Sequence, residues 1–202
     1  GKFIVSRSAE SILKEIEKIS EEESFKGYIS DLGGPSANMY RLGGKDIEIC
    51  KKCKRPTCLH PKICPNLNTD HSEVLKLYSA VRKLPFIKKA FIGSGIRYDL
   101  ATDQYLKEVV KNHVSGRLKV APEHTNDAVL NLMRKPSFSL FKEFDKKFNK
   151  FNEEFNLNQQ LIPYFISSHP GCKPEHMAEL AIETKKLNFR LEQVQDFTPT
   201  PF

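Results

Sequence analysis

Residues 159–168 read QQLIPYFISS, an apolar run that ends in two serines, and this stretch decides the fold class. Its apolar residues stand at consecutive positions and do not alternate strictly with polar ones, which is typical of a strand buried on both faces. Four more segments rich in β-branched and aromatic residues recur along the chain. They are GYISDL from Gly27, KKAFIGSGI from Lys88, RLKVAP from Arg117 and RLEQVQDF from Arg190.

Amphipathic helical stretches separate these segments. Ser8 and Asn126 stand where they can cap two of the helices. The strongest helical periodicity is a phenylalanine stripe, which predicts core packing and consists of Phe138, Phe141, Phe144, Phe148, Phe151 and Phe155. Alternating strands and helices favour right-handed βαβ units and a parallel sheet. We therefore expect an α/β fold over residues 1–202: a partial TIM-like (β/α) barrel of about five parallel strands, with a Cys-rich insert at 41–70.

The composition, 39% hydrophobic and 28% charged, is that of a soluble globular protein. No apolar run approaches the ~18 residues that a membrane span requires, and the first residues lack a secretory signal. We expect a cytoplasmic protein. The net charge of +7 permits attraction to nucleic acid, but lysines alternate with acids in FKEFDKKFNKFNEEF, which favours a solvated helix face instead.

Four of the five cysteines stand close together, in the pattern C-x2-C-x4-C-x5-C. Thiolates two residues apart can bind one ion from a tight turn, and two more complete a tetrahedral site. Zinc and an iron–sulfur cluster both accept four thiolates. We expect a metal here, and we rank His60 and His71 below the cysteines as ligands. The predicted ligands are Cys50, Cys53, Cys58 and Cys64, while Cys172 is a separate thiol.

The carboxyl ends of the expected strands carry Gly, Ser and Pro together with charged side chains. In parallel α/β barrels, ligands bind at these ends. Any one of the turns reads as an ordinary βα connection, but five in succession favour a rim that binds a ligand. The polar side chains on it are Asp31, Arg97, Asp99, Glu123, His124 and His169.

The order of these segments resembles the radical S-adenosylmethionine superfamily, and specifically the YgiQ-type bacterial proteins. The resemblance rests on FKGYISDLGGPSANMY, the cysteine insert through CPNLNTDH, FIGSGIRYDL, LKVAPEHTNDAVLNLMRKP and VQDFTPTP, and covers essentially the whole chain. It implies an iron–sulfur enzyme, an Fe–S oxidoreductase, that cleaves S-adenosylmethionine to a 5′-deoxyadenosyl radical. It names no substrate.

The resemblance also implies roles for individual residues. Gly33 and Gly34 match the glycines that bind the methionine part of S-adenosylmethionine, although Pro35 stands where an acidic residue often follows. Glu123 matches a residue near the ribose hydroxyls, and Ser168 lies where the adenine is expected. Arg97 and His124 are suggested as substrate contacts.

One departure from the superfamily limits what this chain does alone. The superfamily holds its [4Fe–4S] cluster with C-x3-C-x2-C after the first strand, and no cysteines here have that spacing. We expect that motif, and a first strand, just before Gly1. The insert cysteines would then form an accessory cluster or a zinc site, and the isolated chain would be inactive.

Two other interpretations remain open at this point. The four cysteines and the positive charge also suit a basic zinc-bearing module that binds RNA or an acidic partner. A hydrolase or lyase with Glu123 and His169 as acid and base is the third possibility. The sequence does not predict an oligomeric state.

Overall fold

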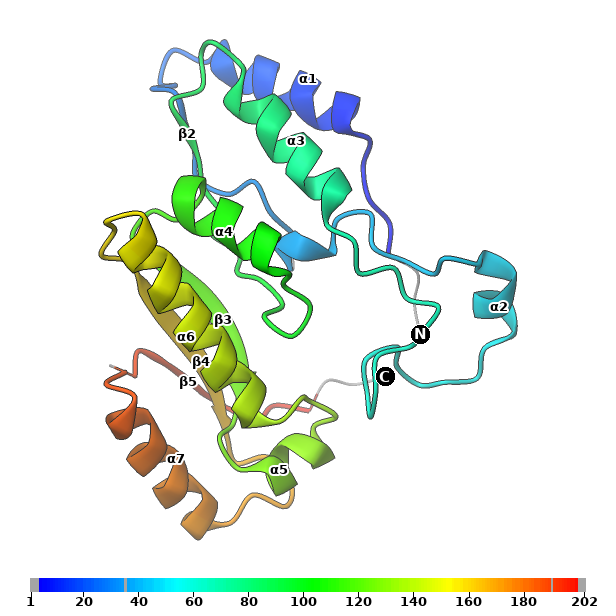
Figure 1. Cartoon of the computed structure of the whole chain (residues 1–202), viewed down its shortest axis with the longest axis vertical. Helices are drawn as coiled ribbons and strands as arrows, with labels where there is room; N and C mark the ends of the chain where they lie inside the picture. The colour runs from blue at the N-terminus through cyan, green and yellow to red at the C-terminus, as the bar shows by residue number, and fades with distance from the viewer. Residues whose placement is uncertain (1–3, 35, 190, 200–202) are drawn as a thin grey trace. The chain divides into compact units, whose positions relative to one another are not determined.

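The computed structural model describes residues 4–34, 36–189 and 191–199, so Pro35 and Arg190 lie outside the described residues. The chain divides into two compact units, Gly1–Ser115 and Gly116–Phe202, which are described separately (Figure 1). Across the described ranges, no helix is long and apolar enough to cross a bilayer.

The first unit joins helices to a two-stranded parallel sheet. Strand β1 pairs with β2, with Tyr28 opposite Lys89 and Ile29 opposite Ala90. A small apolar core fills the space beside this sheet and includes Ile16, Ile29 and Val81. The elements of the unit are α1 (Ala9–Ser20), β1 (Tyr28–Ile29), the 3-10 helix η1 (Ala37–Met39), α2 (Ile47–Lys52), α3 (Ser72–Arg82), β2 (Lys89–Ala90) and α4 (Asp103–Asn112).

The second unit contains a three-stranded parallel sheet in the order β3-β4-β5. Its strands are connected by helices, which gives two successive βαβ units. Figure 1 shows the turns after β3 and β4 at the same end of this sheet, beside α5 and the start of α7. The elements are β3 (Arg117–Glu123), α5 (Asp127–Leu132), α6 (Phe138–Glu154), β4 (Gln160–Ser167), α7 (Pro174–Lys186) and β5 (Gln193–Asp196).

The expected strands and their direction are confirmed. Each of the five apolar segments contains one strand, and the three pairs of neighbouring strands, β1–β2, β3–β4 and β4–β5, are parallel. The described strands form two small sheets and no closed barrel, so the barrel stays a prediction.

Local signals in the sequence also placed helices correctly. The Ser8 hydroxyl accepts a hydrogen bond from the Ser11 N–H, and the Asn126 side chain accepts from the N–H groups of Ala128 and Val129. Five phenylalanines of the α6 stripe are buried, while Phe155 is partly buried. The short helix α2 within the insert was not predicted.

Candidate functional site

A β-bulge at the end of β3 determines where Glu123 lies. Val120 is opposite Pro163 and Glu123 is opposite Phe165, so three residues of β3 match two of β4. An extra residue of this kind bends a strand and redirects the side chain that follows it. Glu123 has a φ of +70°, which is strained for a residue with a side chain. Bulge and strain together mark this strand end as a candidate site.

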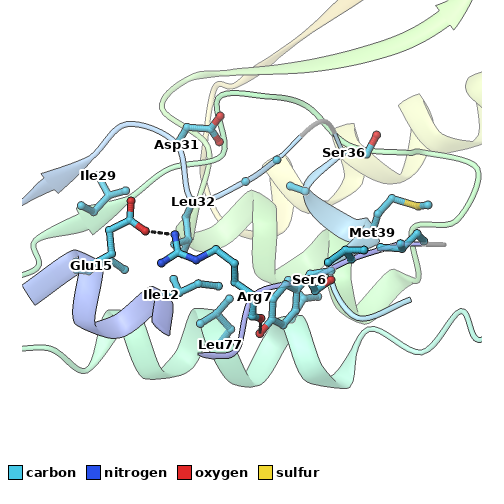
Figure 2. Close-up of a pocket in the computed structure, with 18 of the residues that line it drawn as sticks. Ser6, Arg7, Ile12, Glu15, Ile29, Asp31, Leu32, Ser36, Met39 and Leu77 are labelled. Atoms are coloured by element: carbon cyan, nitrogen blue, oxygen red, sulfur yellow. Dashed lines mark hydrogen bonds and ion pairs between the residues drawn. The ribbon is translucent and has the colours of Figure 1, made fainter. Parts of the chain in front are cut away.

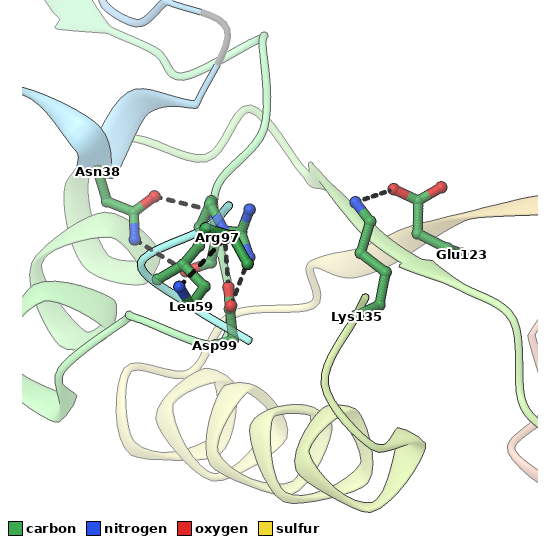
Figure 3. A network of polar contacts seen from close by, with 7 residues as sticks. Asn38, Leu59, Arg97, Asp99, Glu123 and Lys135 are labelled. Carbon is green, nitrogen blue, oxygen red and sulfur yellow. Dashed lines mark hydrogen bonds and ion pairs between the residues drawn. The ribbon is translucent and has the colours of Figure 1, made fainter. Parts of the chain in front are cut away.

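The Glu123 carboxylate is nearly buried and only half satisfied. Its Oε1 accepts a hydrogen bond from Lys135 Nζ at 2.6 Å, as Figure 3 shows. Its Oε2 is buried and has no hydrogen-bond partner among the described residues. A buried acceptor without a partner lowers the stability of the folded state. In a native structure it is explained by a bound ligand, by an ordered water or by local strain.

A second polar group lies at the ends of β4 and β5. The Ser168 hydroxyl donates to Asp196 Oδ1 at 3.1 Å, and the Ser167 hydroxyl donates to the same oxygen. The hydroxyls of Ser167 and then Ser168 hold the pKa of Asp196 below its usual value. Ser168, like Glu123, has a positive φ, of +59°. Glu123 at the end of β3 and Ser168 just after β4 therefore both have a strained backbone at the carboxyl-terminal edge of the sheet.

His124 and Cys172 form a contact between the turns that follow β3 and β4. The Cys172 Sγ lies 3.5 Å from His124 Nε2, and the histidine has no exposed surface. The His124 Nδ1 accepts a hydrogen bond from the Asn126 N–H at 2.9 Å. Burial lowers the pKa of His124, and His176 lowers it further. The ring is therefore neutral at pH 7.

In the first unit, Gly33 lies where the chain leaves β1. A Cβ on Gly33 would stand 2.3 Å from Ser94 Oγ and 2.7 Å from Asp31 Oδ1, so a side chain here would displace both of these groups. A Cβ on Gly34 would meet nothing within 4 Å. Asp31 Oδ1 accepts hydrogen bonds from the Gly93 N–H and the Ser94 hydroxyl. The Asp31 carboxylate thus ties the turns after β1 and β2 together.

A cavity of about 380 Å³ opens beside these glycines. Figure 2 shows Ile12, Ile29, Leu32 and Leu77 around it, with the ion pair between Arg7 and Glu15 across it. The walls are thus mainly apolar, while the backbone of Gly33 and Gly34 forms part of the lining. A volume of this size suits a small organic ligand.

Arg97 is held in place through both its backbone and its guanidinium. Its N–H donates to Asn38 Oδ1 at 2.7 Å, and the Asn38 amide donates to its carbonyl at 2.8 Å (Figure 3). The guanidinium forms a two-point contact with Asp99, at 2.9 and 2.5 Å. A paired, partly exposed guanidinium of this kind is oriented for a ligand that carries an acceptor.

The Cys-rich segment, residues 43–66, is a long loop that we call the excursion. Hydrogen bonds join its two ends, and we call this pair of ends its neck. The Lys45 N–H donates to the Asn66 carbonyl at 2.7 Å, and the Asn68 N–H donates to the Gly43 carbonyl at 2.7 Å. The Asn66 side chain bridges the Asp46 N–H and carbonyl. All residues of 43–66 are described and none of them is buried. No apolar core therefore supports this excursion.

The cysteines of the excursion are only partly organised. Asn66 Nδ2 donates to Cys50 Sγ at 3.2 Å, and the Arg55 N–H donates to Cys53 Sγ at 3.4 Å. The Cys64 N–H donates to the Cys58 carbonyl at 2.7 Å. Within the described residues, no three His, Cys, Asp or Glu side chains converge on one metal position. The donor types and their N–H···S contacts fit a metal, but the four thiols are not gathered.

The predicted ligand residues fall into both units. The first unit contains Gly33, Gly34 and Arg97, and the second contains Glu123, His124 and Ser168. Sequence reasoning missed Lys135, Asp196 and Asn38, which contact the predicted residues. Of these three residues, only Lys135 has a signal in the sequence. It precedes Pro136, and a residue before proline is disfavoured in the helical conformation, which indicates the end of a helix. His169 Nδ1–H donates to the Pro170 carbonyl of the next residue at 2.8 Å, and the His169 and Phe197 rings form a T-shaped pair.

These features define an α/β protein with two small parallel sheets and with strained, polar strand ends. No model of a known protein family matches the chain. The whole chain is 64% identical to a protein of Bacteroides thetaiotaomicron called UPF0313 protein, and 61% identical to one of Porphyromonas gingivalis with the same name. A UPF0313 protein of Chromobacterium violaceum is 53% identical. The chain spans 34%, 34% and 27% of the lengths of these relatives.

Proposed function

We propose that the chain is the cofactor-binding part of a radical S-adenosylmethionine enzyme, and that its strands belong to a partial (β/α) barrel. The observation that carries the proposal is the buried Oε2 of Glu123, which has no partner at a strained strand end. The chain alone would be catalytically incomplete, because no C-x3-C-x2-C motif lies within it. Cysteines elsewhere in a longer polypeptide would hold the cluster.

The Glu123 carboxylate has the chemistry to receive a ribose. Ribose hydroxyls are hydrogen-bond donors, and Oε2 is an acceptor that receives no hydrogen bond from the described residues. Lys135 binds only Oε1, so it offsets the charge and leaves the second oxygen available. A charged acceptor makes a hydrogen bond that contributes about 1.5–3 kcal/mol.

The backbone at Gly33 and Gly34 supports the expected contact with the methionine. Close packing around Gly33 fixes the turn, while the space around Gly34 is open and adjoins the 380 Å³ cavity. Glycine allows a ligand to approach carbonyl oxygens closely. Asp31 would hold this turn in position through its bonds to Gly93 and Ser94.

When bound together with a cluster, S-adenosylmethionine would supply radical chemistry that amino-acid side chains do not. This chain's residues would bind and orient it and exclude water. Ser168, held by Asp196, is proposed beside the adenine. Arg97, oriented by Asp99 and Asn38, is proposed to bind the substrate. His124, which has no exposed surface, would act on a substrate only through Cys172.

The four insert cysteines are proposed to hold zinc or an accessory iron–sulfur cluster. Because no residue of 43–66 is buried, a metal cross-link would supply order in addition to the hydrogen-bonded neck. Metal sites seldom exist fully formed before the metal binds, so ungathered thiols suit a site completed by the ion. The ligands would be Cys50, Cys53, Cys58 and Cys64.

The test uses the full polypeptide that carries these residues, reconstituted with iron and sulfide under anaerobic conditions. We expect reductive formation of 5′-deoxyadenosine from S-adenosylmethionine. Glu123→Gln should weaken S-adenosylmethionine binding about tenfold, the equivalent of ~1.4 kcal/mol, whereas Glu143→Gln on the exposed side of α6 should not. No cluster and no cleavage would refute the proposal.

A second function is favoured by the charge of the excursion. Residues 43–66 contain six basic side chains against two acidic ones, so they could contact RNA phosphates. Binding of a single-stranded RNA that weakens steeply as salt rises, and is lost in Lys52→Glu/Lys54→Glu, would support an RNA-binding module. Salt-independent binding would eliminate it.

A further inference from the structure

Cys172 and His124 form a pair whose role is open in the proposed function. Their contact joins the turn after β3 to the turn after β4, at the edge of the sheet where Glu123 and Ser168 also lie (Figure 1). The histidine is fully buried, and the thiol is partly exposed. The Cys172 sulfur lies 3.5 Å from His124 Nε2 and 3.8 Å from the Lys173 carbonyl.

The hydrogen bonds of His124 determine where its proton lies. Nδ1 accepts from the Asn126 N–H at 2.9 Å, so Nδ1 carries no hydrogen. A neutral imidazole must then carry its hydrogen on Nε2. The Nε2–H therefore donates to the Cys172 sulfur, 3.5 Å away. An imidazolium is excluded because its Nδ1–H would face the Asn126 N–H.

This tautomer excludes two common roles for a Cys–His pair. A histidine that binds a metal through Nε2 donates its Nδ1–H to an acceptor, and here Nδ1 is itself the acceptor. A histidine that deprotonates a cysteine needs a free lone pair on the nitrogen facing the sulfur, and here that nitrogen carries the hydrogen. The pair is built neither as a metal site nor as a nucleophile with its base.

The remaining role follows from the sulfur's surroundings. The His124 Nε2–H occupies a sulfur lone pair, so the S–H bond points elsewhere, and the Lys173 carbonyl lies 3.8 Å from the sulfur as an acceptor. That contact is long and weak. Burial raises the pKa of the Cys172 thiol, which keeps the hydrogen on sulfur at neutral pH. A thiol that keeps its hydrogen is a poor nucleophile, but it retains a hydrogen atom to transfer.

We propose that Cys172 is a hydrogen-atom donor at this edge of the sheet and that His124 positions it. This inference rests on the proposed radical function. A carbon-centred radical on a bound organic molecule takes the hydrogen atom: a C–H bond forms, the S–H bond breaks and a sulfur radical remains. One electron from an external one-electron reductant and one proton from solvent restore the thiol.

The test follows deuterium and needs no substrate. The full polypeptide, reconstituted with iron and sulfide, is given S-adenosylmethionine and dithionite in D2O, without added thiols. Because the hydrogen of a thiol exchanges with solvent, 5′-deoxyadenosine should gain one deuterium, detected by mass spectrometry. Cys172→Ala and Cys172→Ser should lose this label, while Glu175→Gln, at an exposed position in the first turn of α7, should keep it. His124→Phe should reduce the label without changing the amount of protein that folds.

The outcomes separate the inference from the proposed function. Unlabelled 5′-deoxyadenosine, or a label that persists in Cys172→Ala, would overturn the role of Cys172 and leave the radical function standing. Absence of 5′-deoxyadenosine would overturn the radical function and the transfer with it. A second readout is independent of turnover: Cys172 should resist iodoacetamide at pH 7.5 and become reactive only in alkaline solution. Rapid alkylation at pH 7 would contradict a retained hydrogen.

Discussion

The excursion at 43–66 and the helix α6 are stabilised in different ways. The excursion contains a single short helix and no buried residue. Helix α6 buries five phenylalanines on one face. Apolar burial is thus sufficient to order α6, whereas the excursion depends on its hydrogen-bonded neck and on whatever its cysteines bind. The difference teaches that a segment without buried residues needs another source of order, and we propose that a metal held by the cysteines adds to the neck here.

Removing an aromatic ring from α6 should have the largest effect on stability. Phe148 is 1% exposed, and Phe148→Ala should lower the free energy of unfolding by about 3–5 kcal/mol because it leaves a cavity. Urea denaturation measures the loss. The matched change Lys150→Ala on the exposed face should stay within about 0.5 kcal/mol. Equal losses in the two variants would show that the stripe is not a core.

Loss of Lys135 should be the next largest effect, because it strips the last partner from a nearly buried carboxylate. We expect Lys135→Met to cost about 1–3 kcal/mol at pH 7, the range for a buried polar group left unsatisfied. Adding Glu123→Gln to Lys135→Met should recover part of the loss in the same urea experiment. If the double variant is less stable than the single one, the Lys135–Glu123 pair is not the source of the effect.

Removal of metal should loosen the excursion and leave α6 intact. With a chelator, or in Cys58→Ser, proteolysis within 43–66 should become about tenfold faster, equivalent to ~1.4 kcal/mol of local stability. Cleavage sites are read by mass spectrometry, and Cys172→Ser serves as the control. Identical cleavage with and without the chelator would mean that the neck alone orders the excursion.

The smallest expected effect is a pH dependence where the excursion rejoins the core, at His71. Burial lowers the pKa of His71, while Asp70 acts in the opposite direction. The unfolded chain therefore binds a proton that the folded chain resists, and stability should decline as the pH falls below about 6.5, the ordinary histidine value. His71→Gln should flatten this decline in urea titrations at pH 7.5 and 5.5. An unchanged slope would exclude His71 as the cause.

The strands and helix caps were predictable because their signals are local. Apolar runs placed all five strands, and Ser8 and Asn126 cap helices as their side-chain chemistry predicts. Strand length was not predictable from these signals. In the segment GYISDL only Tyr28–Ile29 forms a strand, because only these two residues are paired with residues of the neighbouring strand β2.

The contacts of the candidate site were less predictable. Glu123 was identified from a resemblance, but its partner Lys135 depends on the bulge in β3 and on the left-handed turn at Arg134, with a φ of +55°. Asp196 ties Ser167 and Ser168 together across two parallel strands, and that requires the register of β4 and β5. Neither the bulge nor the register has a sequence signal of its own.

The positive φ of Glu123 has a consequence for how this position can change over generations. Glycine would relieve the backbone at this point, so selection for thermal stability alone would replace the glutamate. The ligand role proposed for the carboxylate would act against that replacement. Selection for activity and selection for stability would then conflict at position 123, and a stability-guided redesign of this protein should leave it unchanged.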